Sequence, residues 1–179
     1  MKTYLTYGVS MALASALLTL VLFFLGFHSD AAKFGMAQWI GNIGLLVISI
    51  ACLVLGMKAR RAEVPATEEF GYGSALFTGF MISLFGGLCS VVTNYLYFHV
   101  INPGFTEIIV QAQLDKMEAK GMSGTQLEQA EKGIRMFMNP IFTGCFVFLG
   151  SLFWGTVISL VAAAFLKRPS TEEAMVTGA

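Results

Sequence analysis

The charged residues of this chain are confined to short segments and leave four long stretches without any charge. These uncharged stretches are residues 3–29, 34–57, 70–106 and 136–166. Each exceeds the ~20 residues that an α-helix needs to cross a ~30 Å hydrocarbon layer. They lack the two-residue alternation of barrel strands, and a helix satisfies its own backbone hydrogen bonds in lipid. The pattern predicts four membrane-spanning helices at about residues 7–27, 36–57, 72–98 and 141–166.

The segment between the third and fourth predicted helices is more polar. An Asn-Pro pair stands at each of its ends, Asn102-Pro103 and Asn139-Pro140, and each pair is typical of an N-cap followed by the first helical residue. Apolar residues recur at helical spacing on both sides of Gly121. We therefore expect an amphipathic helical hairpin at about residues 103–138, which packs on its own bundle, on the lipid surface or on a partner.

The distribution of basic residues predicts the orientation of the helices. One side of the predicted membrane has Lys33 in a short loop and four further bases spread through the long hairpin segment. The other side carries six bases close to the helix ends, which makes it the cytoplasmic side: Lys2, Lys58, Arg60, Arg61, Lys167 and Arg168. Both termini are then cytoplasmic.

Together these features predict an all-α integral membrane protein. The expected fold is an antiparallel four-helix bundle with an extracytoplasmic amphipathic helical hairpin between helices 3 and 4. Residues 1–168 form this single transmembrane domain. The polar, Pro-containing residues 169–179 are expected to be a disordered cytoplasmic tail.

Composition supports the membrane class. The chain has 179 residues, of which 56% are hydrophobic and 12% are charged, whereas a soluble domain has ~25% charged residues. Such a chain has too little polar surface to cover a water-soluble core or to stay disordered in water. Eleven basic and eleven acidic residues give a net charge of zero, so no nucleic-acid partner is expected.

Small residues recur every fourth position in two of the predicted helices. Small side chains let helix backbones approach closely in lipid, so we expect these two helices to pack tightly, together or against a second copy of the chain. The helix-packing residues are Ala75, Gly79, Ser83 and Gly87 in the third helix, and Ser151, Gly155, Ser159 and Ala163 in the fourth.

The few strongly polar side chains within the apolar stretches lie toward the side of the hairpin. Gln38, Asn42, Asn94 and His99 are the candidate members of a polar vestibule that recognises a ligand. The alternative is that these groups hydrogen-bond between helices and serve only packing, as intramembrane amides often do. Trp154 falls in the middle of the fourth helix, so we expect it to face protein and to find a partner for its indole N–H.

Several kinds of chemistry lack their usual residues. No acid or base lies within the predicted hydrophobic cores, although a proton- or ion-coupled transporter normally needs one. His28, His99 and Asp30 share a side but show no metal-ligand spacing. No nucleophile–base pair or phosphate-binding loop is present. We therefore expect no enzymatic activity, no cofactor and no metal. The three cysteines, Cys52, Cys89 and Cys145, fall inside helices and predict no disulfide framework.

Five short segments carry a family resemblance across nearly the whole chain. The chain resembles the small four-helix membrane proteins of Bacteroidota-type bacteria catalogued as domain of unknown function 4199. This resemblance implies a bacterial inner-membrane location and no assigned activity, and it suggests a link to polyprenyl-phosphate glycan chemistry of the envelope. The segments are residues 69–73 (EFGYG), 102–105 (NPGF), 116–123 (KMEAKGMS), 136–140 (MFMNP) and 162–168 (AAAFLKR).

Two functions remain open from the sequence. The first is a non-enzymatic accessory or scaffold subunit of an envelope membrane complex, which acts through the hairpin and the small-residue faces. The alternative is a lipid or small-molecule binder or transporter that uses the polar vestibule. Expected partners are membrane lipids and a second copy of the chain or another membrane protein.

Overall fold

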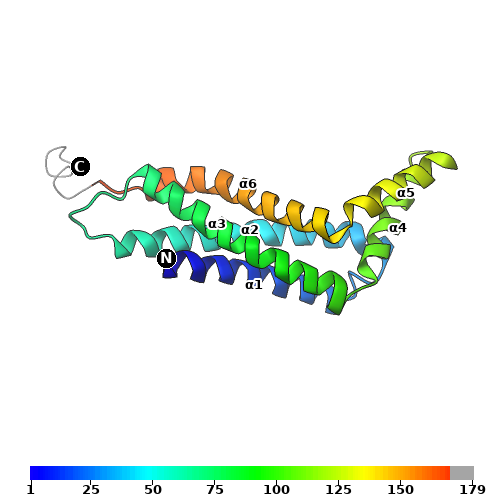
Figure 1. The fold of residues 1–179 in the computed structure, drawn as a ribbon, viewed down its shortest axis with the longest axis horizontal. Helices are drawn as coiled ribbons and strands as arrows, with labels where there is room; N and C mark the ends of the chain where they lie inside the picture. Colours follow the sequence, from blue (N-terminus) through cyan, green and yellow to red (C-terminus); the bar gives the residue numbers. More distant parts are fainter. Residues whose placement is uncertain (170–179) are drawn as a thin grey trace.

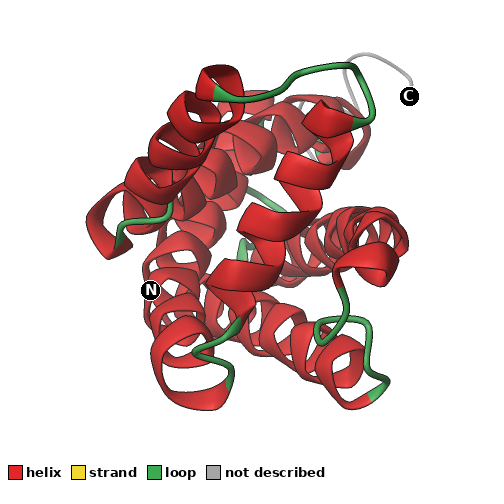
Figure 2. Cartoon of the chain, turned by 90° about the vertical axis from the view of Figure 1, so that its right-hand side faces the viewer, coloured by secondary structure: helices red, strands yellow, loops and turns green. Residues whose placement is uncertain are grey.

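The computed structural model describes residues 1–169, and these form helices joined by short loops (Figures 1 and 2). Four long helices lie side by side along the long axis of the molecule, and two shorter ones lie at one end of them (Figure 1). The helices are α1 (Lys2–Phe24), α2 (Ala31–Glu63), α3 (Tyr72–Leu96) with its π-helical continuation η1 (Tyr97–Ile101), α4 (Phe105–Glu118), α5 (Thr125–Phe137) and α6 (Pro140–Leu166).

Four helices in the described part of the chain are long and apolar enough to cross a membrane. They are Lys2–Phe24, Ala31–Glu63, Tyr72–Ile101 and Pro140–Leu166, and each overlaps one of the four uncharged stretches. The prediction of four apolar helices of membrane-spanning length is therefore confirmed. The predicted tail falls, except for Pro169, outside the described residues.

The helix ends differ from the predicted positions. α2 extends from Ala31 to Glu63, well beyond residues 36–57, because Asp30 caps its first turn and basic residues continue its last turns. The Asp30 carboxylate accepts a hydrogen bond from the backbone N–H of Ala32 at 2.9 Å. α1 already begins at Lys2. The charged residues that bound an uncharged stretch therefore mark the end of its apolar part but not the end of the helix.

The two Asn-Pro pairs have different roles. Asn139 caps α6 as expected, since its side chain accepts from the N–H of Ile141 at 3.0 Å and Pro140 is the first helical residue. The expected cap at Asn102 is wrong, because α4 begins only at Phe105 after Gly104. The Asn102 side chain instead makes long-range hydrogen bonds, described below.

The small-residue faces of α3 and α6 lie against each other. A Cβ atom added to Gly79 would lie 2.0 Å from Ser159 Oγ, and one added to Gly155 would lie 2.0 Å from Ser83 Oγ. Each glycine thus receives the serine of the other helix. The remaining small residues of the two faces belong to the same contact between α3 and α6: Gly87 lies opposite Ser151, and Ala75 and Ala163 are both fully buried in one cluster.

α1 approaches α3 through backbone contact. A Cβ at Gly8 would lie 2.9 Å from both the backbone N of Gly86 and the backbone O of Ile82. No larger residue fits there without separating the helices. α3 therefore lies between α1 and α6 and packs closely against both.

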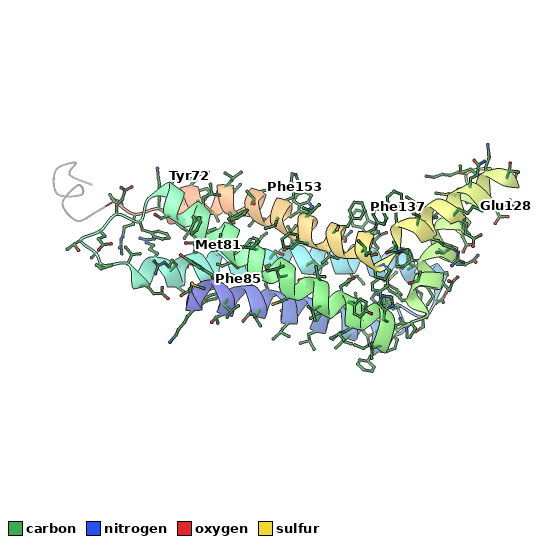
Figure 3. The ribbon with its side chains drawn as sticks, in the orientation of Figure 1. Tyr72, Met81, Phe85, Glu128, Phe137 and Phe153 are labelled. Atoms are coloured by element: carbon green, nitrogen blue, oxygen red, sulfur yellow. The ribbon has the colours of Figure 1, made fainter. Side chains whose placement is uncertain are left out.

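We call the end of the bundle formed by Phe24, Ala31, Ile101 and Pro140 the α4–α5 end, and the other the opposite end. α4 covers the α4–α5 end through a core of Phe34, Tyr97, Phe105 and Ala112. α5 buries no residue and projects away from the bundle (Figure 1). Figure 3 shows Phe137 where α5 meets α6 and Glu128 far out on α5.

Candidate functional site

A large cavity lies among α1, α2, α3 and α6. Its volume is about 760 Å³, within the ~300–1,000 Å³ typical of small-molecule sites. On each helix the lining residues recur mainly at intervals of three or four, so one face of each helix forms the wall. The polar lining residues are Ser15 and Thr19 of α1, Asn42 and Ser49 of α2, Ser90, Thr93, Asn94 and Tyr97 of α3 and η1, and Ser151 and Trp154 of α6.

Several hydroxyl groups on this wall donate to helix backbones. Ser15 Oγ donates to Met11 O at 2.8 Å, and Thr19 Oγ1 donates to Ser15 O at 3.1 Å. Thr93 Oγ1 makes the same kind of bond. Such a bond uses the hydroxyl's only hydrogen but leaves its oxygen able to accept. These residues can therefore accept hydrogen bonds from a ligand without losing their own.

The two amides of the cavity have no partner. Asn42 and Asn94 make no hydrogen bond to any described residue, and the hydroxyls of Ser49 and Ser90 make none either. Asn42 is exposed and Asn94 is half-buried within the chain; where lipid surrounds the helices, an amide without a hydrogen bond costs roughly 2–7 kcal/mol relative to water. The cavity wall thus presents two groups that each gain from a polar ligand or from water.

The cavity opens sideways between α2 and α6. At the opposite end these helices pack together through Met57, Ala162 and Leu166. Nearer the α4–α5 end, the lining residues Leu46 and Trp154 are 47% and 59% exposed. The opening is therefore bordered by large apolar side chains.

The other helix pairs stay close at the level of the cavity. A Cβ at Gly41 of α2 would lie 3.8 Å from Leu22 of α1, and one at Gly144 of α6 would lie 3.5 Å from Val91 of α3. Phe23 of α1 contacts Tyr97 with ring centroids 6.2 Å apart. The side between α2 and α6 is therefore the open side of the cavity.

A hydrogen-bonded cluster borders the cavity at the α4–α5 end. Tyr97 is buried and lines the cavity, and its hydroxyl lies 2.5 Å from His28 Nδ1. Asn102 Nδ2 donates to this hydroxyl and to His28 O, both at 3.3 Å. The His28 ring stacks on Phe105 with centroids 4.3 Å apart. The cluster connects the α1–α2 loop, η1 and the start of α4.

Burial lowers the pKa of His28, because the apolar surroundings disfavour the imidazolium. A neutral ring can accept at Nδ1, so the Tyr97 hydroxyl donates to it while accepting from Asn102. The Tyr97 hydroxyl, His28 Nδ1 and Asn102 Nδ2 are then used within the cluster, whereas His28 Nε2 and Asn102 Oδ1 have no hydrogen-bond partner among the described residues. The cluster therefore closes one end of the cavity through hydrogen bonds among three of its groups.

The structure brings together two of the four predicted vestibule residues. Asn42 and Asn94 line the large cavity. His99 is exposed and borders a separate pocket of about 40 Å³, which Asn94 also reaches. Gln38 is exposed and lines neither. Trp154 faces the opening, and its indole N–H has no partner in the described residues, so the expectation that it faces protein is wrong.

Most of the cavity's polar residues were not predicted from the sequence. They are serines and threonines, which are common in apolar helices and carry little signal singly. The spacing of four polar residues is nevertheless informative: Ser90, Thr93, Asn94 and Tyr97 lie at positions i, i+3, i+4 and i+7 of one helix. A polar face inside an otherwise apolar span would have indicated this wall of the cavity.

The histidines have different surroundings. His28 belongs to the buried cluster with Tyr97, whereas His99 contacts Tyr95 with ring centroids 4.5 Å apart. Within residues 1–169 no three His, Cys, Asp or Glu side chains gather as metal ligands would.

The fold and the cavity together define a class. This is a helical protein with four helices of membrane-spanning length in its described residues and a cavity between them lined by neutral polar and apolar side chains. The chain belongs to the family described as protein of unknown function (DUF4199), whose sequence profile matches residues 6–168. The family resemblance noted in the sequence is thereby confirmed. No curated protein and no solved structure matches the chain.

Proposed function

We propose that this protein binds a lipid or another small amphipathic molecule within a bacterial inner membrane and does so without catalysing a reaction. The carrying observation is that Asn42 and Asn94, two amides without partners in the described residues, line the same cavity. Packing amides would be expected to bond each other or a neighbouring helix. Two unbonded amides on one cavity wall favour a ligand.

The topology that goes with this proposal is an antiparallel bundle with both termini in the cytoplasm and α4 and α5 outside. Its support is the set of six bases close to the helix ends at the opposite end, against Lys33 and four bases spread through residues 103–138 at the α4–α5 end. In a variant without native cysteines, an external thiol reagent is expected to label a cysteine at Gly121 and to leave one at Arg61 unmodified. The reverse labelling would invert the topology.

The binding proposal is tested by the double variant Asn42→Leu/Asn94→Leu. The protein is purified from its membranes in a mild detergent, and native mass spectrometry measures any mass retained above that of the polypeptide. Wild-type protein is expected to retain a lipid-sized adduct and the double variant to lose most of it. Leucine has a similar volume but cannot hydrogen-bond.

Gln38→Leu is the matched control, because Gln38 is, like Asn42, an exposed amide of α2 but lies outside the cavity. It is expected to retain the adduct. Equal retention by all three proteins, each folded by circular dichroism, would contradict a binding role for the cavity amides.

A second candidate function is that of an accessory or scaffold subunit. The observation that favours it is α5, which buries no residue and presents Leu127, Ile134 and Phe137 on one side. The faces of small residues on α3 and α6 support it less, because they pack against each other within the chain. The scaffold role predicts a stoichiometric membrane partner that is lost from the purified protein when Leu127 and Ile134 are both changed to Ser.

A further inference from the structure

The cavity has polar groups but no charged ones. None of the described residues that line it is an Asp, Glu, Lys, Arg or His. Its amides and hydroxyls can both donate and accept hydrogen bonds. Resting on the proposed binding function, we propose that the ligand is a neutral lipid with hydroxyl or carbonyl groups, of the diacylglycerol type, and that lipids bearing a phosphate are excluded.

The depth of the cavity supports this selectivity. On α2, Asn42 is nine residues from Lys33, and Ser49 is nine residues from Lys58. At 1.5 Å per residue, each of these two cavity residues lies about 14 Å along the helix from the nearest charge on α2. On α2 the polar wall therefore lies in the middle of the span. A charge at this depth is costly unless it is paired or hydrated, and the wall offers no cation to a phosphate.

The route into the cavity supports a lipid ligand. Its opening between α2 and α6 is bordered by exposed Leu46 and Trp154. In a bilayer this opening faces acyl chains. A molecule that already dissolves in the hydrocarbon layer enters without crossing water, and its neutral head meets Asn42, Asn94 and Ser90 inside.

The test uses Trp154 as a reporter of occupancy. The chain has two tryptophans, and Trp39 is 72% exposed and does not line the cavity. Trp39→Phe thus leaves a single tryptophan at the opening. This protein is placed in phosphatidylcholine nanodiscs with rising fractions of a lipid brominated on its acyl chains, which quenches tryptophan on contact. Three lipids with identical chains are compared: brominated dioleoylglycerol, dioleoylphosphatidic acid and dioleoylphosphatidylcholine.

We expect dioleoylglycerol to reach half-maximal quenching at a mole fraction at least about tenfold below that of phosphatidic acid, since burying a charge at mid-span opposes binding. Phosphatidylcholine reports ordinary contact of Trp154 with bulk lipid. Adding Asn42→Leu/Asn94→Leu is expected to move the dioleoylglycerol curve onto the phosphatidylcholine curve.

The outcomes separate the two proposals. Quenching by phosphatidic acid at an equal or lower fraction than dioleoylglycerol, with both below phosphatidylcholine, overturns the neutral-lipid inference and leaves the binding function standing. A single curve for all three lipids in the protein with native Asn42 and Asn94 overturns both. Because the lipid comparison needs only the Trp39→Phe protein, it does not depend on the folding of the double variant.

Discussion

The two halves of the bundle differ in how closely their helices approach. Toward the opposite end, α3 and α6 interlock through Gly79, Ser83, Gly155 and Ser159, with space for no additional atom. Toward the α4–α5 end, the same two helices and α1 and α2 surround about 760 Å³ of empty space. One sequence thus builds a tightly packed region and an open one along the same helices.

The difference follows from which side chains face inward. In α3 the inward face changes from Ala75, Gly79 and Ser83 to Thr93, Asn94 and Tyr97. Small residues let backbones touch, which maximises van der Waals contact where lipid provides no hydrophobic drive. The larger polar residues face the cavity and leave hydrogen-bonding groups there, while the gap itself lies between α2 and α6. The tight half therefore stabilises the fold, and the open half contains the cavity to which we assign the proposed binding function.

The largest predicted effect comes from adding a methyl group to the tight half. In Gly155→Ala the new Cβ would lie 2.0 Å from Ser83 Oγ and 2.6 Å from Ser83 Cβ. A short serine on a rigid helix cannot move aside, so α3 and α6 must separate. Overpacking of this kind costs about 1–3 kcal/mol. The free energy of unfolding in detergent micelles should fall by that amount.

The matched control is Gly150→Ala, on the same helix but at the cavity. A Cβ there meets nothing within 4 Å, and alanine favours a helix over glycine by up to about 1 kcal/mol. This variant should be as stable as the wild type or more stable. Equal destabilisation by both substitutions would mean that the two halves are packed alike.

Sequence patterns predicted the tight half better than the open one. The seam between α3 and α6 depends on residue size at every fourth position, which can be read directly from Gly79, Ser83, Gly155 and Ser159. The four uncharged stretches similarly located the long helices, because hydrocarbon excludes charge over a fixed thickness. Both signals are local to one helix.

The cavity depends on relations that no single helix contains. Asn42 and Asn94 were expected at the vestibule together with Gln38. Gln38 lies one turn before Asn42 on the same face of α2 but beyond the cavity, so the outcome depends on where along the helix the cavity ends. Asn102 resembled a helix cap locally, yet it donates to the backbone of His28, 74 residues away. Tertiary hydrogen bonds of this kind override local signals when the partner is buried.

The next effect concerns pH at the closed end of the cavity. Burial lowers the pKa of His28 in the folded protein, so the unfolded chain binds the proton more readily. Stability is then complete above the ordinary histidine pKa of ~6.5 and falls as the pH drops through that value. Protonation also turns Nδ1 into a donor and removes the acceptor for Tyr97. The melting temperature in detergent should therefore decrease on mild acidification.

Two histidine variants identify the group responsible. His28→Asn should weaken the fold at neutral pH and flatten its dependence on mild acidification. His99→Gln should keep the wild-type pH response, since His99 is exposed. If instead His99→Gln removed the response, the closed end of the cavity would not be its source.

A smaller effect on stability is expected when the cavity is filled. Gly150→Leu adds an isobutyl group on the cavity wall where a Cβ meets open space. The free energy of unfolding should stay within about 1 kcal/mol of wild type, because no packed group is displaced. The adduct detected by native mass spectrometry should nevertheless decrease. Undiminished retention in a folded Gly150→Leu protein would argue that the ligand lies elsewhere.

The smallest effect on stability is expected from the exposed ion pair between α4 and α5. Arg135 of α5 pairs with both carboxylate oxygens of Glu107 on α4, at 2.6 and 2.8 Å, and with Glu131 at 2.9 Å. The Arg135 guanidinium lowers the pKa of Glu107, so the pair persists into acid. Its side chains are largely exposed, and such pairs contribute little to global stability. Arg135→Gln should leave the melting temperature nearly unchanged.

Its consequence should be local. α5 has no buried residue. Besides the ring contacts of Phe137 with Phe142 and Phe146 of α6, the link to Glu107 is a main restraint on its position. In Arg135→Gln, amide hydrogen exchange should rise across residues 125–137 and stay constant in the four long helices. High salt should have the same effect on the wild type, because it screens the ion pair. Lys132→Gln removes an α5 charge that has no ion pair in the described residues and should change neither. Faster exchange in α3 or α6 of Arg135→Gln would mean that α5 supports the bundle and does not merely project from it.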